Sequence, residues 1–281
     1  MSDAPIVVLK FGGSVLTDTD RFADVAREIG GWRADGWLVV AVVSALCGRT
    51  DELVSRCRSS KIRPDAHTQA GVLALGERES SALLALALGS SGLPALALTP
   101  GGVGLRAEGD PLDATPTALD SRVFHDALAR SGVIVFPGFV ALDMHGRTVT
   151  LGRGGSDLTA LFLAHALGAQ HCRLVKDVDG LYDRDPATHP DARRFDTATY
   201  EHALATDGSI VQHKAVRFAR RQRITFTLGR LGDRQPTVIG MCSGEGSLAP
   251  RDPESPRPRK DAGCAGSIGA CDLPPSTLTA H

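Results

Sequence analysis

The segment VVLKFGGSVL, residues 7–16, runs from an unbroken apolar stretch into a glycine turn. Such a stretch is typical of a strand buried on both faces of a parallel sheet. Lys10 follows the stretch, and Gly12 and Gly13 allow the backbone to turn its N–H groups towards an anion. A lysine here can hold a transferring phosphoryl group, although a tight turn with a solvated lysine is the alternative. The spacing matches neither a Walker A loop nor a GxGxxG fingerprint.

Similar apolar runs recur along the chain and alternate with longer segments of helical periodicity. Strands are predicted at residues 6–10, 38–44, 95–99, 133–137, 148–151, 173–176 and 225–228. Helices are predicted at residues 20–33, 51–59, 66–88, 117–130, 156–167 and 210–221. This alternation predicts an α/β fold with a mostly parallel sheet and helices on both faces.

Composition excludes several classes of protein. The 281 residues are 42% hydrophobic, which is enough for a proper core, and the net charge of −1 gives no basic excess for nucleic acid. The first ten residues do not resemble a signal peptide, and the longest apolar run, around residues 37–45, is too short to span a membrane. Six cysteines without a CxxC motif are typical of reduced thiols, so we expect a cytoplasmic protein.

The character of the sequence changes near its end. Residues 243–281 are rich in proline, glycine and charge and have no apolar period. We predict a disordered tail there, and a folded domain at residues 1–242.

A second glycine-rich motif is more specific than the first. In TVTLGRGGSDLTALFLAHALGA, residues 148–169, three glycines surround Arg153 before an apolar helix begins. Arginine can grip a carboxylate or phosphate with two hydrogen bonds, and a helix N-terminus offers N–H groups to a second anion. Ser156 is the predicted N-cap, and Asp157 has the charge to orient Lys10. The alternative is a glycine-rich loop with a capping serine and an acid that complements the helix dipole.

A third motif, LVKDVDGLYDRDP at residues 174–186, follows a predicted strand. It can be interpreted as a turn-rich loop, because Asp-Gly and Asp-Pro punctuate it. The sharper interpretation is a nucleotide site, with Tyr182 near a base and Lys176 or Arg184 near phosphates. The register and closing glutamate of a calcium-binding EF-hand loop are absent.

Taken together and in this order, these motifs resemble the amino-acid kinase superfamily, and aspartate kinases most closely. KFGGS at 10–14 is similar to the family's phosphate motif, and GRTVTLGRGGSD at 146–157 is close to the aspartate kinase signature. Further similar segments are VVSALCGRTDEL at 42–53, GERESSALLALAL at 76–88, KDVDGLYDRDP at 176–186 and VQHKAVRFARRQRI at 211–224. The resemblance covers about residues 4 to 240.

The resemblance implies a three-layer αβα sandwich of the amino-acid kinase or carbamate kinase-like type. The substrate would bind in the half spanning about 1–150, and the nucleotide in the half spanning about 151–242. The implied reaction transfers the γ-phosphoryl group of ATP, bound with Mg²⁺, to the side chain of L-aspartate. Its product, 4-phospho-L-aspartate, begins the branch towards lysine, threonine and methionine. A carboxylate is already ionised at neutral pH, so no general base is required.

Roles at matching positions follow from the resemblance. The catalytic pair would be Lys10, which stabilises the phosphoryl group, and Asp157, which orients Lys10. Nucleotide and phosphates would be held by Lys10, Gly12, Gly13, Lys176, Asp177, Tyr182 and Arg184, and no residues are assigned as metal ligands.

The implied substrate pocket has five members. Glu77 would take the α-amino group of aspartate and Arg153 its α-carboxylate. Ser44, Thr50 and Ser156 would line the pocket. From the residues alone, Glu77 could equally be an exposed acid near a helix start, and the spacing of Thr50 favours an N-cap for a helix that begins at Asp51.

The nucleotide half departs from the family pattern. Lys176 replaces a usual threonine, Ala187 a usual arginine, and Ser209 a usual lysine. We expect Lys176, Arg184 or Lys214 to supply the missing positive charge.

The regulatory ACT domains usual in aspartate kinases have no counterpart after residue 242, so we expect no built-in feedback inhibition. A homodimer is expected, with a separate regulatory or homoserine dehydrogenase chain as a further partner, and no nucleic acid or membrane. Alternatives are a kinase of another small acid in the superfamily, such as glutamate 5-kinase, acetylglutamate kinase or uridylate kinase, and a catalytically weak regulatory subunit.

Overall fold

A computed structural model of the chain describes residues 4–59, 64–206 and 208–241. The predicted tail at 243–281 lies outside these residues. Among the described residues, no helix is both long enough and apolar enough to cross a membrane.

The central feature of the described chain is an eight-stranded sheet with β1 near its middle. All six residues of β1 are buried, as the apolar run predicts, and β1 is parallel to both of its neighbours, β2 and β9. Within the described residues, the pair β13–β14 is antiparallel, and every other pair of neighbouring strands in this sheet is parallel. In spatial order the strands are β12 (Thr197–Thr199), β14 (Thr237–Gly240), β13 (Phe226–Arg230), β9 (His171–Lys176), β1 (Ile6–Phe11), β2 (Leu38–Val43), β6 (Val133–Pro137) and β3 (Leu96–Ala97).

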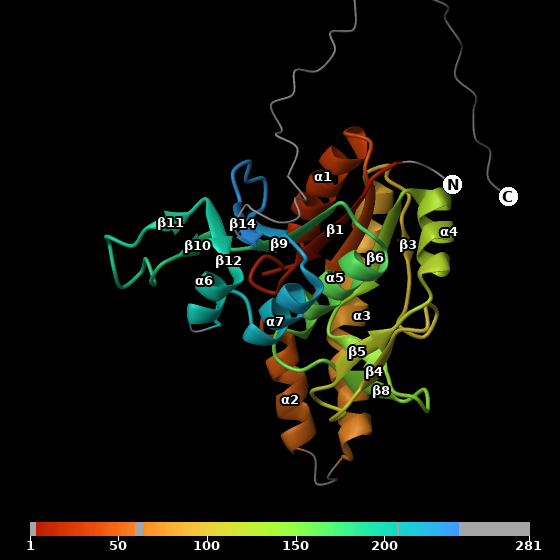
Figure 1. Cartoon of the computed structure of the whole chain (residues 1–281). Coiled ribbons are helices and arrows are strands. Elements are labelled where there is room, and N and C mark those ends of the chain that lie inside the picture. Colours follow the sequence, from red (N-terminus) through yellow and green to blue (C-terminus); the bar gives the residue numbers. More distant parts are fainter. Residues whose placement is uncertain (1–3, 60–63, 207, 242–281) are drawn as a thin grey trace, which may run out of the picture. The chain divides into compact units, whose positions relative to one another are not determined.

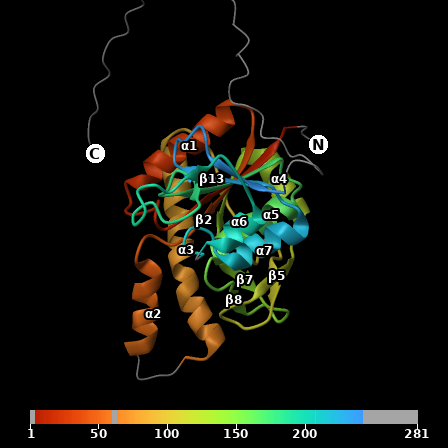
Figure 2. The ribbon, with the colours of Figure 1, turned by 60° about the vertical axis from the view of Figure 1, so that its left-hand side comes forward.

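Helices cover both faces of this sheet (Figures 1 and 2). On one face α1 (Arg21–Ala34) and α3 (Ala66–Ser90) pack on a core that includes Phe22, Ile29 and Leu84. On the other face α4 (Ser121–Ser131), α5 (Gly155–Ala166) and α7 (His213–Gln222) contribute to a core that includes Phe124, Leu161 and Val216. The three-layer αβα sandwich is therefore confirmed. The remaining helices are α2 (Arg49–Ser59), which contacts α3, and α6 (Tyr200–Ala205), which contacts α7.

Two smaller sheets accompany the sandwich. A four-stranded sheet contains, in spatial order, β5 (Thr115–Ala118), β4 (Arg106–Glu108), β7 (Val140–Leu142) and β8 (Thr148–Thr150), and β8 packs against α3. A two-stranded sheet pairs β10 (Leu181–Tyr182) with β11 (Arg194–Phe195).

All seven predicted strands and all six predicted helices are present, with shifted ends. The helix predicted at 117–130 begins at Ser121, because Thr115–Ala118 forms β5. The helix predicted at 210–221 begins at His213, which leaves residues 210–212 non-helical. Sequence periodicity missed α6 and the short strands β4, β5, β7, β10, β11, β12 and β14, which are too brief to show a period.

Candidate active site

A pocket of about 310 Å³ lies at the carboxyl ends of β1, β2 and β9, where parallel α/β sheets bind their ligands. The predicted site residues come to it from both halves of the sequence. Eight of them line it: Lys10, Ser44, Thr50, Glu77, Arg153, Ser156, Asp157 and Lys176.

A buried cluster of three charges occupies the base of the pocket. The Oδ1 atom of Asp157 lies 2.7 Å from Lys10 Nζ, and its Oδ2 atom accepts a hydrogen bond of 2.7 Å from Lys176 Nζ. Lys10 projects from the end of β1, Lys176 ends the adjacent β9, and Asp157 lies in the first turn of α5. One carboxylate therefore holds two ammonium groups, which leaves the cluster with one net positive charge.

Burial and neighbouring charge set the protonation of this cluster. Burial lowers the pKa of Lys10 to about 8, and the nearby Lys176 charge acts in the same direction while Asp157 opposes it. Burial alone would raise the pKa of Asp157, but the two lysines outweigh it and hold the pKa at about 2. Asp157 is thus ionised at neutral pH and keeps the two lysines in place.

The glycine-rich loop brings Asp157 to this position. Gly152 and Gly154 have φ values of 71° and 73°, a region that favours glycine. A Cβ atom at Gly154 would overlap the Gln212 side chain. Gly154 is also the N-cap of α5, so the prediction that Ser156 caps this helix is wrong. Ser156 lies instead within the first turn, against Gly138, where a Cβ atom would come 2.6 Å from that of Ser156.

Glu77 enters the pocket from the middle of α3 and is only 3% exposed, so the alternative of an exposed acid is wrong. Its Oε1 atom accepts a hydrogen bond of 3.2 Å from the backbone N–H of Ala45, at the end of β2. Its Oε2 atom is buried and has no hydrogen-bond partner among the described residues. Burial raises the pKa of Glu77 to about 7. An unpartnered carboxylate oxygen of this kind suits a ligand ammonium group.

Three other predicted substrate residues are more exposed than Glu77. Arg153 is exposed, and the described residues give it no hydrogen bond or ion pair. Thr50 lies inside α2, which begins at Arg49, so the N-cap interpretation of Thr50 is wrong. Ser44 and Thr50 are both half-buried at the pocket wall. A free guanidinium group at the rim can thus meet a ligand carboxylate.

The first glycine turn packs closely beside the charge cluster. A Cβ atom at Gly12 would come 2.9 Å from Lys10 Nζ, and one at Gly13 would come 3.1 Å from the Ala45 carbonyl oxygen. A larger residue at either position would therefore have to displace the Lys10 amino group or the Ala45 carbonyl.

Three predicted nucleotide residues lie outside the pocket lining, on the segment that follows β9. The Asp177 carbonyl accepts a hydrogen bond of 3.0 Å from Arg230, and the Tyr182 hydroxyl donates to Asp179. Arg184 is exposed and lies 3.6 Å from Asp191. This segment forms β10 and β11, which project from the sandwich (Figure 1). The nucleotide roles of these residues stay predictions.

Lys176, Arg184 and Lys214 were expected to supply the positive charge that the family's usual arginine and lysine provide. Of these three, Lys176 lines the pocket. Lys214 instead donates to Asp113 at 2.6 Å and to the carbonyl of Leu151 at 3.1 Å. Ser209, which aligns with a lysine usual in the family, also lines the pocket.

Sequence reasoning missed Phe139, Ile210 and Gln212 as pocket residues. Phe139 has a φ of 66°, which no local sequence pattern indicates. Its N–H group donates to Thr159 of α5.

No cluster of three or more histidine, cysteine or acidic side chains that could hold a metal ion occurs within the described residues. Asp157 is engaged by two lysines.

Comparison with known proteins places this geometry in a family. The chain is 36% identical to an aspartokinase of Pseudomonas aeruginosa over 222 residues, which are 78% of this chain and 54% of that protein. It is 35% identical to an aspartokinase of Thermus thermophilus over 224 residues, 79% of this chain and 55% of that protein. The chain thus spans about half the length of the curated relatives it matches.

Structural comparison agrees with the sequence match. The crystal structure of aspartate kinase from Synechocystis superposes with a TM-score of 0.74 and 31% identity, covering 86% of this chain and 40% of that one. The profile of the amino acid kinase family matches residues 5–228, which include every residue of the pocket. The chain therefore belongs to the amino acid kinase family.

Proposed function

We propose that this chain transfers the γ-phosphoryl group of ATP to the side-chain carboxylate of L-aspartate, giving 4-phospho-L-aspartate and ADP. The observation that carries the proposal is one pocket in which Asp157 holds Lys10 and Lys176 while Glu77 and Arg153 remain open to a ligand. The likeness to aspartokinases over nearly four-fifths of the chain supports the choice of substrate.

The two ends of aspartate find complementary partners in this arrangement. The α-ammonium group pairs with the unpartnered Oε2 atom of Glu77, which favours the ionised form of that carboxyl. The α-carboxylate meets the guanidinium group of Arg153 at the rim. The side-chain carboxylate is then left to act as the nucleophile.

Phosphoryl transfer needs positioning and charge neutralisation more than it needs proton chemistry. The carboxylate oxygen forms a bond to the γ-phosphorus as the bond to the bridging oxygen of ADP breaks. Lys10 neutralises charge that develops on the transferring group, and Asp157 fixes the direction of Lys10. Lys176, with Mg²⁺ carried by the nucleotide, neutralises charge on the phosphates.

A hydroxylamine assay tests the proposal, because hydroxylamine traps an acyl phosphate as a coloured hydroxamate. The purified chain is incubated with MgATP and aspartate, with glutamate, or with UMP, and ADP release is followed in parallel. We expect hydroxamate with aspartate and its loss in Lys10→Ala at unchanged folding. ADP release with glutamate or UMP that equals or exceeds release with aspartate would identify a different kinase of the family. Absence of turnover and of any MgATP effect on the melting temperature would indicate a binding subunit.

Homodimer formation and a separate regulatory or homoserine dehydrogenase partner stay predictions. Size-exclusion chromatography with light scattering would measure whether the chain forms a homodimer.

A further inference from the structure

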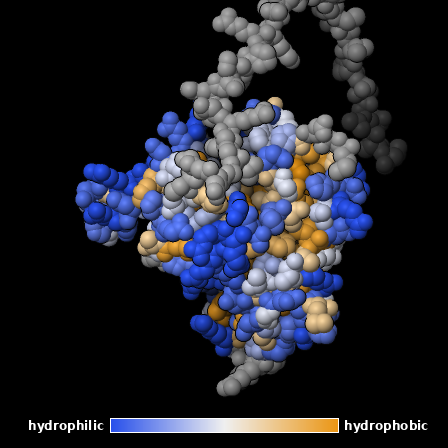
Figure 3. Space-filling view, in the orientation of Figure 1, coloured by the Kyte–Doolittle hydropathy of each residue, from blue (hydrophilic) through white to orange (hydrophobic). Residues whose placement is uncertain are grey.

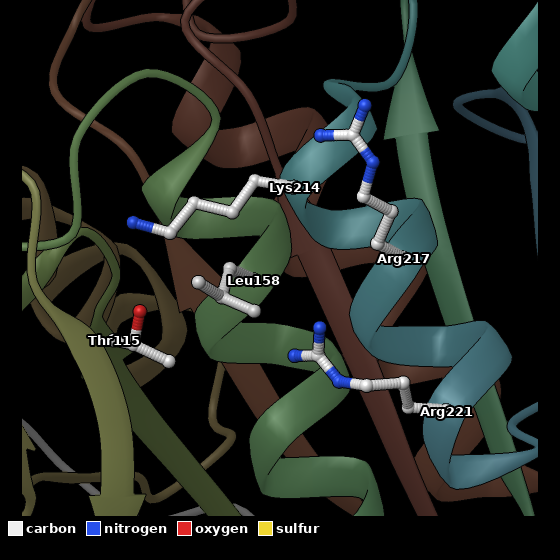
Figure 4. Close-up of a pocket in the computed structure, with 5 residues that line it drawn as sticks. All are labelled: Thr115, Leu158, Lys214, Arg217 and Arg221. Atoms are coloured by element: carbon white, nitrogen blue, oxygen red, sulfur yellow. The ribbon is translucent and has the colours of Figure 1, made fainter.

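A second pocket of about 220 Å³ lies between α7, the start of α5 and β5, and it shares no lining residue with the catalytic pocket. Its wall carries three basic side chains of α7, namely Lys214, Arg217 and Arg221, and its other lining residues are Thr115 and Leu158 (Figure 4). The surface over α7 is strongly hydrophilic in the space-filling view (Figure 3).

The two arginines of this pocket have no acidic partner in the described chain. Arg217 and Arg221 are one helical turn apart, so they share one face of α7, and both are exposed. No hydrogen bond or ion pair joins either of them to another residue among those described. Arg220, on another face of the same helix, differs because it lies 3.7 Å from Glu201. Two unneutralised guanidinium groups thus adjoin one cavity.

The remaining lining adds an apolar floor and a hydroxyl group. Leu158 is buried, and in Figure 4 the guanidinium group of Arg221 reaches towards Leu158 and Thr115, while the Thr115 hydroxyl points towards the end of Lys214. The guanidinium group of Arg217 is turned away from Thr115 in this view, and its exposed side chain has no hydrogen bond or ion pair among the described residues that would hold it there. A hydroxyl and two forked guanidinium groups are the donor set that proteins use for phosphate.

Lys214 lines the pocket, and its charge is paired with that of Asp113. Its amino group donates to the Asp113 carboxylate at 2.6 Å, and to the carbonyls of Ala114 at 2.9 Å and Leu151 at 3.1 Å. The Asp113 charge is therefore already paired, which weakens its repulsion of a second anion. Through Leu151 the same lysine holds the start of the glycine-rich loop that carries Asp157.

We propose that Arg217, Arg221 and Thr115 form a binding site for a phosphate group, separate from the catalytic pocket. The ligand is inorganic phosphate or the phosphate of a small phosphomonoester, since the cavity is large enough for either. The inference stands on this pocket alone and does not depend on the reaction proposed above.

Isothermal titration calorimetry of the full chain at constant ionic strength tests this site, with inorganic phosphate and glycerol phosphate as the probes. The double substitution Arg217→Gln with Arg221→Gln should raise the Kd at least about tenfold, because two charge-assisted donors are lost. Thr115→Val should raise it by a smaller factor. Tighter binding of glycerol phosphate would identify an organic phosphate as the ligand.

Two control variants show whether phosphate binds in this pocket or elsewhere on the protein. Arg220→Gln removes the same charge from the same helix and should leave the Kd unchanged. Lys10→Ala removes a phosphate contact of the other pocket, so the effect of the double substitution should persist in that background. An unchanged Kd in the double variant, or an equal loss in Arg220→Gln, would overturn the proposal.

Discussion

The carboxylate of Asp157 lies 2.7 Å from the amino group of Lys10, and the two side chains are only 4% and 6% exposed. The sequence separates these residues widely, and the parallel order of β1 and β9 beneath α5 brings them together. Because its second oxygen holds Lys176, Asp157 controls two cations with one charge. Loss of this carboxylate should therefore affect both stability and reaction.

Asp157→Asn leaves two lysines in a buried site without a counter-charge. We expect the free energy of unfolding to fall by about 3–5 kcal/mol, the range for breaking a buried pair. Phosphorylation should fall more than a hundredfold, since Lys10 loses its orientation. Urea unfolding and the hydroxamate assay measure the two effects. Asp24→Asn, which removes an acid from exposed pairs with Arg21 and Arg27, is the matched control and should change neither.

Glu77 should give aspartate binding an acidic pH limit. Burial raises its pKa to about 7 in the free protein, and only its ionised form attracts the substrate ammonium group. The KM for aspartate should therefore rise as the pH falls below about 7. Glu77→Gln should raise KM above pH 7, where the wild-type carboxyl is ionised, and should abolish this dependence. A variant that keeps the wild-type pH profile would show that another group titrates.

Glu77 should also make the free energy of unfolding depend on pH. The pKa of Glu77 is raised from 4.5 to about 7 on folding, so the folded state holds its proton more tightly than the unfolded state. Its contribution is complete below pH 4.5 and is lost as the pH rises to about 7. Glu77→Gln should therefore stabilise the protein relative to the wild type above pH 7, by about 3 kcal/mol at most, and not below pH 4.5. Urea unfolding at pH 8 and pH 4 compares the two proteins.

Lys10 should give the reaction its basic pH limit. Its pKa is lowered to about 8, and the charged form is needed to neutralise the phosphoryl group. The value of kcat/KM should fall as the pH rises above about 8, because this parameter reports the free enzyme. Lys10→Arg should keep only weak activity, but that activity should lack the basic limb, since guanidinium stays charged. A basic limb that survives in this variant would contradict the assignment.

Replacing Gly152 should cause both backbone strain and a steric clash. It has a φ of 71°, and a Cβ atom there would overlap the Asp113 carboxylate that binds Lys214. Gly146 has a φ of 79°, but open space surrounds its missing Cβ. Gly146→Ala should therefore cost only about 1–2 kcal/mol, the conformational term. Gly152→Ala should destabilise the protein further and lower activity, as thermal unfolding and the hydroxamate assay would report.

Much of the fold follows from local patterns in the chain. The apolar runs at 6–10 and 133–137 are β1 and β6, because a strand buried on both faces needs continuous apolar residues. The glycines on either side of Arg153 likewise mark a loop with left-handed backbone, which is where α5 begins. The short strands β4, β5 and β7 of the four-stranded sheet gave no such pattern, since their pairing depends on distant partners.

The sequence by itself determined the residue types of the site: two lysines, an aspartate, a glutamate and an arginine around two glycine turns. Only the tertiary structure decided which of them meet. Lys176 pairs with Asp157, while Lys214 is held by Asp113 and the Leu151 carbonyl. Strand order and helix packing set these distances, and the direct interaction between two side chains requires contact within a few ångströms, whatever their separation along the chain.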